Sequence, residues 1–404
     1  MKVAILEYIS GGGFSDKNLP SSILSEGYGM LNSALFDFKE AGHKTYTLLD
    51  SRIALFKPPL RADKIHLVNS KEEFKIKIVD LLKNAEISLI IAPESEGILS
   101  NLLNLSEELN IESLNCDVSS INIVCNKFKL YERLKENGLS IPKTYKVKID
   151  EGIEKIQKIV RNISFPLIVK PTEGIGCYGL SVVKSFSQIP IAINKVKEEV
   201  KTDTCIIQEF VKGIHASVSL ISNGKEAFPL TLNLQIMNLN APDKASSYLG
   251  GIVPFDHELK DRAFQIAKRA VELFNGLKGY IGVDLILSEN GPQLIEINPR
   301  LTVSYIGLRQ VSNLNLAKAM IKACLNDELP EGFNHSGYSI FLKEPLKKLN
   351  GNILEKIYSM KEVITPPFPI NNENYALIAT KGKNIKEAKI IFKRIKRKIQ
   401  RILN

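Results

Sequence analysis

The first 120 residues alternate short apolar segments with longer segments whose apolar residues recur at helical spacing. The segments expected to be strands are 2–8 (KVAILEY), 43–50 (HKTYTLLD) and 87–93 (ISLIIAP). Between them, 21–42 and 71–85 have the periodicity of amphipathic helices, the first ending at a glycine. This β-α-β rhythm predicts a parallel sheet with helices on both faces, so the chain should begin with an α/β domain.

The overall composition describes an ordinary folded protein of several domains. At roughly 100–200 residues per domain, 404 residues predict two to four domains. The sequence has no apolar run of about 18 residues, so no membrane span is expected. The five cysteines are scattered and lack C-x-x-C spacing. That pattern predicts a reducing cytoplasmic setting, without a disulfide framework or a zinc site.

The net charge of +10 is concentrated in the final segment, 385–404 (IKEAKIIFKRIKRKIQRILN). Its apolar residues recur at helical spacing, and nearly all the others are Lys or Arg. Such a helix could bind nucleic acid or an anionic membrane surface. The interpretation favoured here is a surface helix with a solvated basic face, which is what charge runs usually are. Neither a nucleic-acid partner nor a membrane is therefore expected.

The segment 280–300 (YIGVDLILSENGPQLIEINPR) predicts a hairpin that carries oxygen ligands. Two apolar strands are separated by a polar turn at 288–292. Asp284 lies on the first strand, while Glu296 and Asn298 are two residues apart on the second and so face the same side. Hard divalent cations such as Mg²⁺ prefer oxygen clusters of this kind. Arg300 follows directly and suits a phosphate or a carboxylate.

The segment 165–185 (FPLIVKPTEGIGCYGLSVVKS) contains glycines at 174, 176 and 179. Their spacing matches a dinucleotide fingerprint, but that motif needs a following helix, and here a second strand follows. A glycine-rich loop between two strands is a flap whose backbone N–H groups can close over phosphates. Lys170, at the end of the first strand, can supply a positive charge. The alternative is a plain glycine-rich turn.

Other nucleotide-binding signatures are missing from the sequence. Gly224-Lys225 and Gly382-Lys383 are followed by Glu and Asn, so neither completes a P-loop. The HRD and DFG elements of protein kinases are also absent. We also find no Ser-His-Asp or Cys-His arrangement, so catalysis through a side-chain nucleophile is not expected.

Weaker signals lie around these two motifs. Lys127 follows Asn126, a candidate N-cap, at the start of a helix; it either faces an anion or is an ordinary surface lysine. The strand exit at 205–213 could offer backbone groups to an adenine between Gln208 and Val211. Further segments that could contact a substrate, or could simply be tight turns, are 10–13, 25–27, 93–94, 233–235 and 248–251.

The order of these motifs resembles the ATP-grasp superfamily over about residues 1–330, and the tail resembles the small closing element of many members. The resemblance implies an α/β fold, α+β in its catalytic part: a Rossmann-like parallel-sheet domain, a central lid and a C-terminal ATP- and metal-binding subdomain. The implied domains are 1–120, 121–206 and 207–330, followed by a small β-rich tail at 331–404 that the basic helix closes.

The resemblance also implies a role for each site residue. Lys127 and Lys170 would bind ATP phosphates, which Gly174, Gly176 and Gly179 would cover. Gln208, Glu209 and Val211 would meet the adenine, and His215 stands where many members have an acidic ribose-binding residue. Asp284, Glu296 and Asn298 would hold two Mg²⁺ ions, which Mn²⁺ could replace. Arg300, with Lys170, would stabilise the transferring phosphate.

The implied reaction is the ATP-dependent joining of a carboxylate to an amine, with an acyl phosphate intermediate and release of ADP and phosphate. The finer pattern, including EYISGGG, IAPESEGIL and YLGGIVP, resembles the archaeal ligases that join tyramine to glutamate in methanofuran biosynthesis. A ligase for another amino acid or dipeptide, an ATP-dependent small-molecule kinase and a nucleic-acid-binding module are the alternatives. The partners expected are a small-molecule acid and an amine, and a homodimer is left open.

Overall fold

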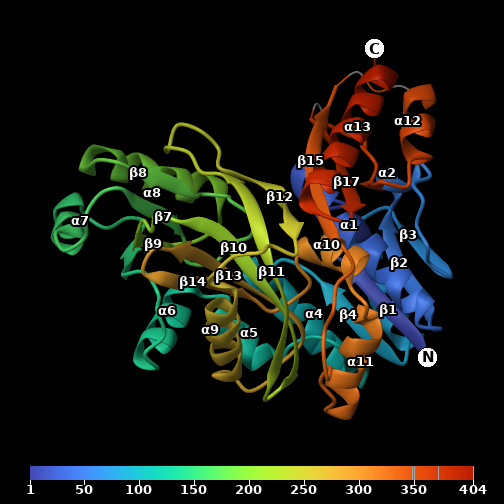
Figure 1. Ribbon diagram of the computed structural model, residues 1–404, viewed down its shortest axis with the longest axis horizontal. Helices are drawn as coiled ribbons and strands as arrows, with labels where there is room; N and C mark the ends of the chain where they lie inside the picture. Colours follow the sequence, from blue (N-terminus) through green and yellow to red (C-terminus); the bar gives the residue numbers. More distant parts are fainter. Residues whose placement is uncertain (348, 350, 372, 404) are drawn as a thin grey trace.

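Three β-sheets form the body of the protein in a computed structural model. The parallel N-terminal sheet and the small central sheet lie at opposite ends, with a long antiparallel sheet between them (Figure 1). The structure describes the chain from 1 to 403 apart from positions 348, 350 and 372, and position 404 also lies outside it. All four of these positions fall in the expected tail, 331–404.

The N-terminal sheet is five-stranded and parallel, with the strand order β3-β2-β1-β4-β5. Its strands are β1 (Lys2–Glu7), β2 (Lys44–Asp50), β3 (Lys64–Val68), β4 (Ile87–Ile91) and β5 (Glu112–Ser113). Its helices are α1 (Ser21–Glu40), α2 (Ser51–Ala54), α3 (Lys71–Lys83) and α4 (Ile98–Glu108). Val3 and Ile5 pack with α1, whereas Ala4 and Leu6 pack with α3 and α4. The predicted sheet with helices on both faces is therefore confirmed.

The central sheet is four-stranded and antiparallel, with the order β6-β9-β7-β8. Its strands are β6 (Thr144–Lys148), β7 (Leu167–Pro171), β8 (Ser181–Val183) and β9 (Thr204–Glu209). The helices before and within this part are α5 (Val118–Val124), α6 (Lys127–Glu136), α7 (Ile153–Val160) and α8 (Ile189–Glu199). The glycine-rich loop joins β7 to β8, so it is indeed flanked by strands on both sides.

The long sheet has eight strands in the order β14-β13-β10-β11-β12-β15-β17-β16. They are β10 (Ile214–Gly224), β11 (Ala227–Asn238), β12 (Ser247–Val253), β13 (Leu277–Ser288), β14 (Gly291–Asn298), β15 (Tyr338–Leu346), β16 (Val363–Thr365) and β17 (Asn374–Gly382). Its helices are α9 (Lys260–Glu272), α10 (Ser304–Val311), α11 (Leu316–Asn326), α12 (Gly351–Tyr358) and α13 (Ile385–Leu403). This sheet continues across the division expected at 330/331, because β12 pairs with β15. The domain boundaries themselves stay predictions.

The hairpin expected at 280–300 is β13 and β14, but its turn is shorter than expected. Gly291 and Pro292 belong to β14 and pair with Ser288 and Leu287. A proline fits there because β14 is the edge strand of its sheet, where one side of the backbone needs no ladder partner.

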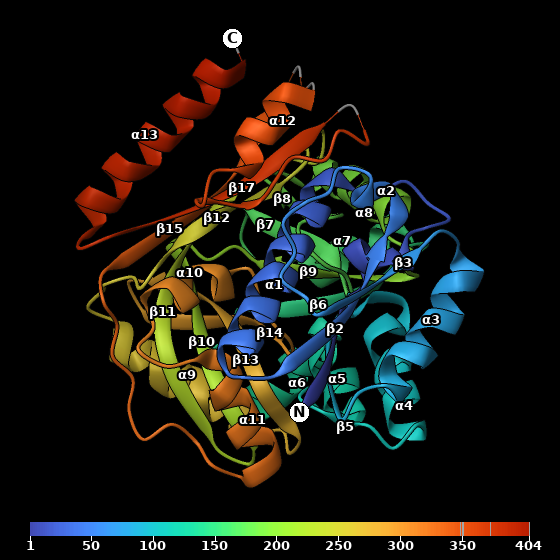
Figure 2. The ribbon, with the colours of Figure 1, turned by 90° about the vertical axis from the view of Figure 1, so that its right-hand side faces the viewer.

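The tail packs against the first helix of the chain. Strands β16 and β17 contact α1, and Figure 2 shows β17 and α13 above that helix. Phe368 meets the ring of Tyr28 edge-on at 5.2 Å, and Thr365 Oγ1 donates to the Ser25 carbonyl at 2.6 Å. Helix α13 buries Phe392 and three other apolar residues, while its basic residues lie mostly on the exposed side. The expected amphipathic basic helix is confirmed.

Two further expectations concern the whole chain. Among the described residues, no helix is long and apolar enough to cross a membrane. All five cysteines are free thiols.

We expect Phe341→Ala to destabilise the protein by about 3–5 kcal/mol, because the fully buried ring on β15 packs against Gly307 and Gly251 and its loss leaves a cavity. Urea unfolding followed by circular dichroism would measure this change. Ile390→Ala is the control, since Ile390 is 67% exposed and its truncation should change stability by less than about 0.5 kcal/mol. Equal effects of both substitutions would contradict this account of the core.

Candidate active site

The hairpin β13–β14 brings the three predicted oxygen ligands together. Asp284 lies directly opposite Glu296, at a register shift in the pairing of the two strands. Asn298 donates through Nδ2 to Asp284 Oδ2 at 3.3 Å. Gln235 on β11 donates through Nε2 to the other carboxylate oxygen, Oδ1, at 2.9 Å. Two carboxylates and two amides thus gather on one face of the sheet, at one side of a cavity.

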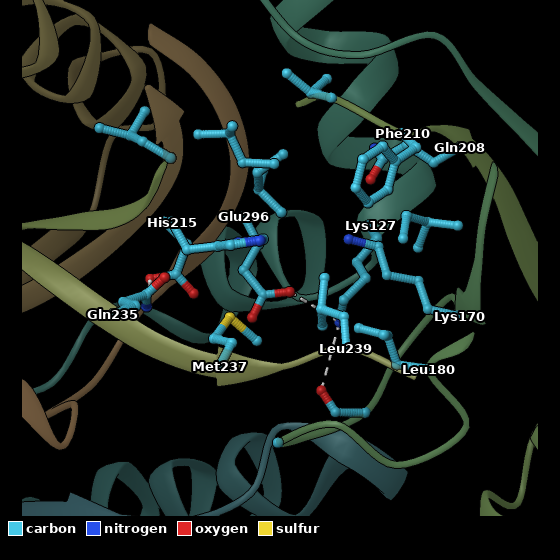
Figure 3. A pocket seen from close by; sticks show the side chains of 18 of the residues that line it. Lys127, Lys170, Leu180, Gln208, Phe210, His215, Gln235, Met237, Leu239 and Glu296 are labelled. Carbon is cyan, nitrogen blue, oxygen red and sulfur yellow. Dashed lines mark hydrogen bonds and ion pairs between the residues drawn. The ribbon is translucent and has the colours of Figure 1, made fainter. Parts of the chain in front are cut away.

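Two lysines approach these carboxylates from the other side of the cavity. Lys127 begins α6, whose N-cap Asn126 accepts a hydrogen bond from the Lys129 N–H at 3.1 Å, as the sequence predicted. The Nζ atom of Lys127 lies 3.3 Å from Glu296 Oε2 and 3.4 Å from the Gly174 carbonyl oxygen. Lys170 extends from β7 and is only 5% exposed. Figure 3 shows Glu296 and His215 on one side of the cavity and Lys170 and Gln208 on the other.

The charges of this cluster shift one another's pKa values. Burial raises the pKa of Asp284 to about 7, and neighbouring Glu296 adds to the rise. Burial would also raise the pKa of Glu296, but Lys127 and Lys170 outweigh it and hold that pKa below its ordinary value. Burial lowers the pKa of Lys170 to about 8, although Glu296 opposes the shift. For Lys127, Glu296 outweighs burial and the pKa is raised.

The glycine-rich loop contributes part of the cavity wall. Gly174 and Gly176 line the cavity, and Gly176 has a φ of +59°, which favours glycine. Gly179 does not line it. Its N–H already donates to Glu199 Oε2 at 2.6 Å, at the base of the loop. The structure therefore does not bring Gly179 to the other predicted residues.

The far end of the cavity is mostly apolar. The exit of β9 contributes residues 208–211, and His215 follows on β10. The side chain of Gln208 is engaged elsewhere, because its Nε2 donates to Thr144 Oγ1 at 2.8 Å. Burial lowers the pKa of His215, so the imidazole is neutral at pH 7. The apolar walls come from several strands and include Ile168, Leu180, Met237, Leu239 and Ile286.

Arg300 lies at a second, adjacent cavity. It forms an ion pair with Glu94, with Nε 2.7 Å from Oε1 and Nη2 3.2 Å from Oε2. Burial would lower the pKa of Arg300, but Glu94 outweighs it and raises that pKa. The second cavity is lined by Arg300, by residues of the N-terminal domain and by Gly176, which also lines the first cavity. The glycine-rich loop is therefore where the two cavities meet.

Several of these residues were not singled out by the sequence. Met237 and Leu239 follow Gln235 at two-residue spacing along and beyond β11, a signal that could have placed them on one face. Glu94 and Arg300 were each singled out, but their pairing had no signal, since the two residues are 206 positions apart. In contrast, Asn233 was suggested as a pocket residue, but its Nδ2 donates to Ser219 Oγ at 2.9 Å within the sheet.

The donor set fits magnesium. Mg²⁺ commonly takes one or two protein carboxylates together with substrate phosphate oxygens and water. Asp284 and Glu296 supply the carboxylates, and burial together with neighbouring Glu296 raises the pKa of Asp284, a shift that a bound cation would oppose. Within the described part of the chain, no group of three or more His, Cys, Asp or Glu residues has a metal-site arrangement.

Comparison with known proteins assigns the chain to a family. Residues 43–121 match the pre ATP-grasp 3 domain, and residues 124–304 match the ATP-grasp domain. The tyramine–L-glutamate ligase of Methanocaldococcus jannaschii is 33% identical over 329 residues, which are 81% of this chain and 90% of the relative. The chain belongs to the ATP-grasp family. It is an ATP-dependent carboxylate–amine ligase, and the predicted family resemblance is confirmed.

Solved structures of other proteins share the fold. N5-carboxyaminoimidazole synthase from Aspergillus clavatus, in complex with ADP, aligns with a TM-score of 0.68 at 16% identity, over 99% of this chain and 98% of the other. The biotin carboxylase domain dimer of Hydrogenobacter thermophilus 2-oxoglutarate carboxylase, in complex with MgADP, gives 0.68 at 16% identity, over 96% and 87%. At these identities the likeness shows the fold alone, and it confirms the predicted ATP-grasp architecture.

We expect metal-free protein to lose stability as the pH rises from 5 to 8, and Asp284→Asn to reduce that loss by about 1–2 kcal/mol. A carboxylate whose folded pKa is raised from 3.8 to about 7 favours folding at low pH, and this contribution disappears as the pH rises through 7. Urea unfolding in EDTA at both pH values would measure it. The control is Asp261→Asn on the exposed side of α9, which should match wild type. An unchanged pH dependence in Asp284→Asn would contradict the shift.

Proposed function

We propose that the protein activates the side-chain carboxyl of glutamate as an acyl phosphate and joins it to an amine such as tyramine, releasing ADP and phosphate. The observation that carries this proposal is the position of Arg300 at a cavity that meets the lysine- and carboxylate-lined cavity at Gly176. A nucleotide in the first cavity would then present its terminal phosphate to an acid in the second. The identity to tyramine–L-glutamate ligases supports this choice of substrates.

The residues of the first cavity divide into three groups by the chemistry they offer. Lys127 and Lys170 would neutralise the phosphates, and N–H groups of the loop at Gly174 and Gly176 would cover them. The exit of β9 and the apolar walls would hold the adenine. Neutral His215 would accept or donate one hydrogen bond to the ribose, without the charge of an acidic residue.

Asp284, Glu296 and Asn298 would hold two Mg²⁺ ions, which when bound would supply positive charge between the phosphate oxygens. Lys127 now contacts Glu296 at 3.3 Å and provides part of that charge itself. Arg300 would stabilise the negative charge that develops on the transferring phosphoryl group and on the acyl phosphate. Glu94 would keep the guanidinium oriented while the flap excludes water, which would otherwise hydrolyse the acyl phosphate. We also propose a cytoplasmic location, which the scattered cysteines of the sequence support.

We expect purified protein with ATP, Mg²⁺, glutamate and tyramine to release ADP, and Glu296→Gln to lower kcat at least ~100-fold, because it removes a charge from the metal position. A coupled ADP assay would measure both. Glu289→Gln, at the exposed hairpin turn, is the control and should match wild type. ADP release that does not depend on the amine would indicate a kinase, and full activity of Glu296→Gln would refute the metal position.

We expect Lys170→Met to raise the KM for ATP by at least ~10-fold and to lower kcat, because a buried charge beside the phosphates is lost. The KM for glutamate should change much less, since Arg300 lies at the other cavity. Initial rates at varied ATP and varied glutamate would separate the two constants. Lys184→Met, at an exposed lysine just beyond β8, is the control. An increase confined to the glutamate KM would contradict the proposed role.

A further inference from the structure

A largely buried ion pair joins the tail to the N-terminal domain beside the second cavity. Lys343, on β15, contacts Glu26, on α1, and their side chains are 5% and 16% exposed. The Lys343 Nζ also donates to Ser22 Oγ at 2.7 Å and lies 5.9 Å from the centre of the Tyr248 ring. The pair therefore brings together residues that are 317 positions apart.

Glu26 belongs to the same cavity as Arg300. That cavity has an empty volume of about 460 Å³ with its solvent-open part included, and Ile23, Met30 and Val303 give it apolar walls. The cavity thus has a positive charge from Arg300, just after β14, and a negative charge from Glu26 on α1. A small molecule bound between Arg300 and Glu26 would meet opposite charges at its two ends.

The other acidic residue of this cavity, Glu7, is already engaged. Its carboxylate accepts hydrogen bonds from the Ile9 N–H at 3.1 Å, the Ser10 N–H at 2.7 Å and the Ser10 hydroxyl at 2.6 Å. These bonds hold the loop after β1, so Glu7 has a structural role. Glu26 differs, because its carboxylate pairs with the ammonium of Lys343 at the junction with the tail.

The tail also contacts α1 through groups other than this pair. Thr365 hydrogen-bonds to the Ser25 carbonyl, Phe368 packs on Tyr28, and Leu377 and Thr365 lie against Gly29. Apolar contacts generally stabilise an interface at least as well as a buried ion pair, because the two charges must leave water. A buried pair retained beside a cavity therefore suggests a role in recognising charge.

We propose that Glu26 and Lys343 bind the α-ammonium and α-carboxylate of the amino-acid substrate, whose side-chain carboxyl faces Arg300. An amino-acid zwitterion carries two opposite charges a few bonds apart and can pair with both members of the ion pair at once. The carboxylate to be activated is then the one that the zwitterion-binding pair leaves free. This inference rests on the proposed ligase function and assigns a specificity role to a residue of the tail.

The test compares glutamate with two analogues that each lack one α-group. Glutarate lacks the α-ammonium, and 4-aminobutyrate lacks the α-carboxylate, but both keep the reacting carboxyl. ADP release with ATP, Mg²⁺ and tyramine would be measured for wild type, Glu26→Gln and Lys343→Met. The control is Lys396→Met, which breaks the ion pair with Glu344 on the same strand β15, where Nζ and Oε2 are 2.6 Å apart.

We expect Glu26→Gln to raise the KM for glutamate about tenfold or more and to leave the KM for glutarate within about twofold. Lys343→Met should likewise raise the KM for glutamate and leave the KM for 4-aminobutyrate within about twofold. The control Lys396→Met should leave the KM values for glutamate, glutarate and 4-aminobutyrate unchanged. If Lys343→Met does not fold, Lys343→Arg keeps the charge but moves the donor atoms, and it should raise the KM for glutamate and spare 4-aminobutyrate.

Equal changes for glutamate and the two analogues would overturn the inference, because they would indicate a purely structural pair. So would an unchanged KM for glutamate in folded Glu26→Gln. A wild-type enzyme that releases no ADP with any of the three acids would instead defeat the proposed function and, with it, this inference. Wild-type turnover of glutamate with no loss of discrimination in the variants would overturn the inference alone.

Discussion

The site depends on two carboxylates, Asp284 and Glu296, that the pairing of β13 with β14 holds directly opposite each other. Two negative charges on directly paired residues repel each other. Partial burial of the carboxylates makes this repulsion stronger. The two carboxylates are stabilised unequally by the groups around them. Glu296 has Lys127 at 3.3 Å, whereas Asp284 accepts hydrogen bonds from amides, and burial and Glu296 raise its pKa to about 7 although Lys170 opposes the rise. Additional positive charge beside Asp284 would therefore be favourable, as expected where a metal and phosphates bind together.

The positively charged side chains near these carboxylates come from separate parts of the chain. Lys127 comes from the first turn of α6 and Lys170 from the central sheet, while Arg300 follows β14 and is held by Glu94 of the N-terminal domain. Packing of α6 and the central sheet beside the long sheet therefore brings the two lysines to the carboxylates. The residues that line the two cavities come from all three sheets and the segments that follow them.

The local elements could be predicted well from the sequence. The β-α-β rhythm, the Asn126 cap and the amphipathic α13 all follow from side-chain periodicity and capping chemistry, which act over a few residues. The hairpin was predicted with a turn that was too long, because β-propensity does not show that an edge strand accepts Pro292. The continuity of the long sheet into the tail could not be seen, since β12 and β15 are separated by three helices and two strands and pair through backbone groups that carry no sequence pattern.

The sequence by itself determined the family, the reaction class and the oxygen-rich hairpin, because these rest on residue types at short, characteristic spacings. Only the tertiary structure decided which charges pair. It placed Gly179 at the base of the flap, joined Arg300 to Glu94, and brought Lys343 of the tail to Glu26 of the first helix. The physical reason is that electrostatic interactions depend on distance and burial in space, and contacts between residues hundreds of positions apart leave no local signal in one sequence.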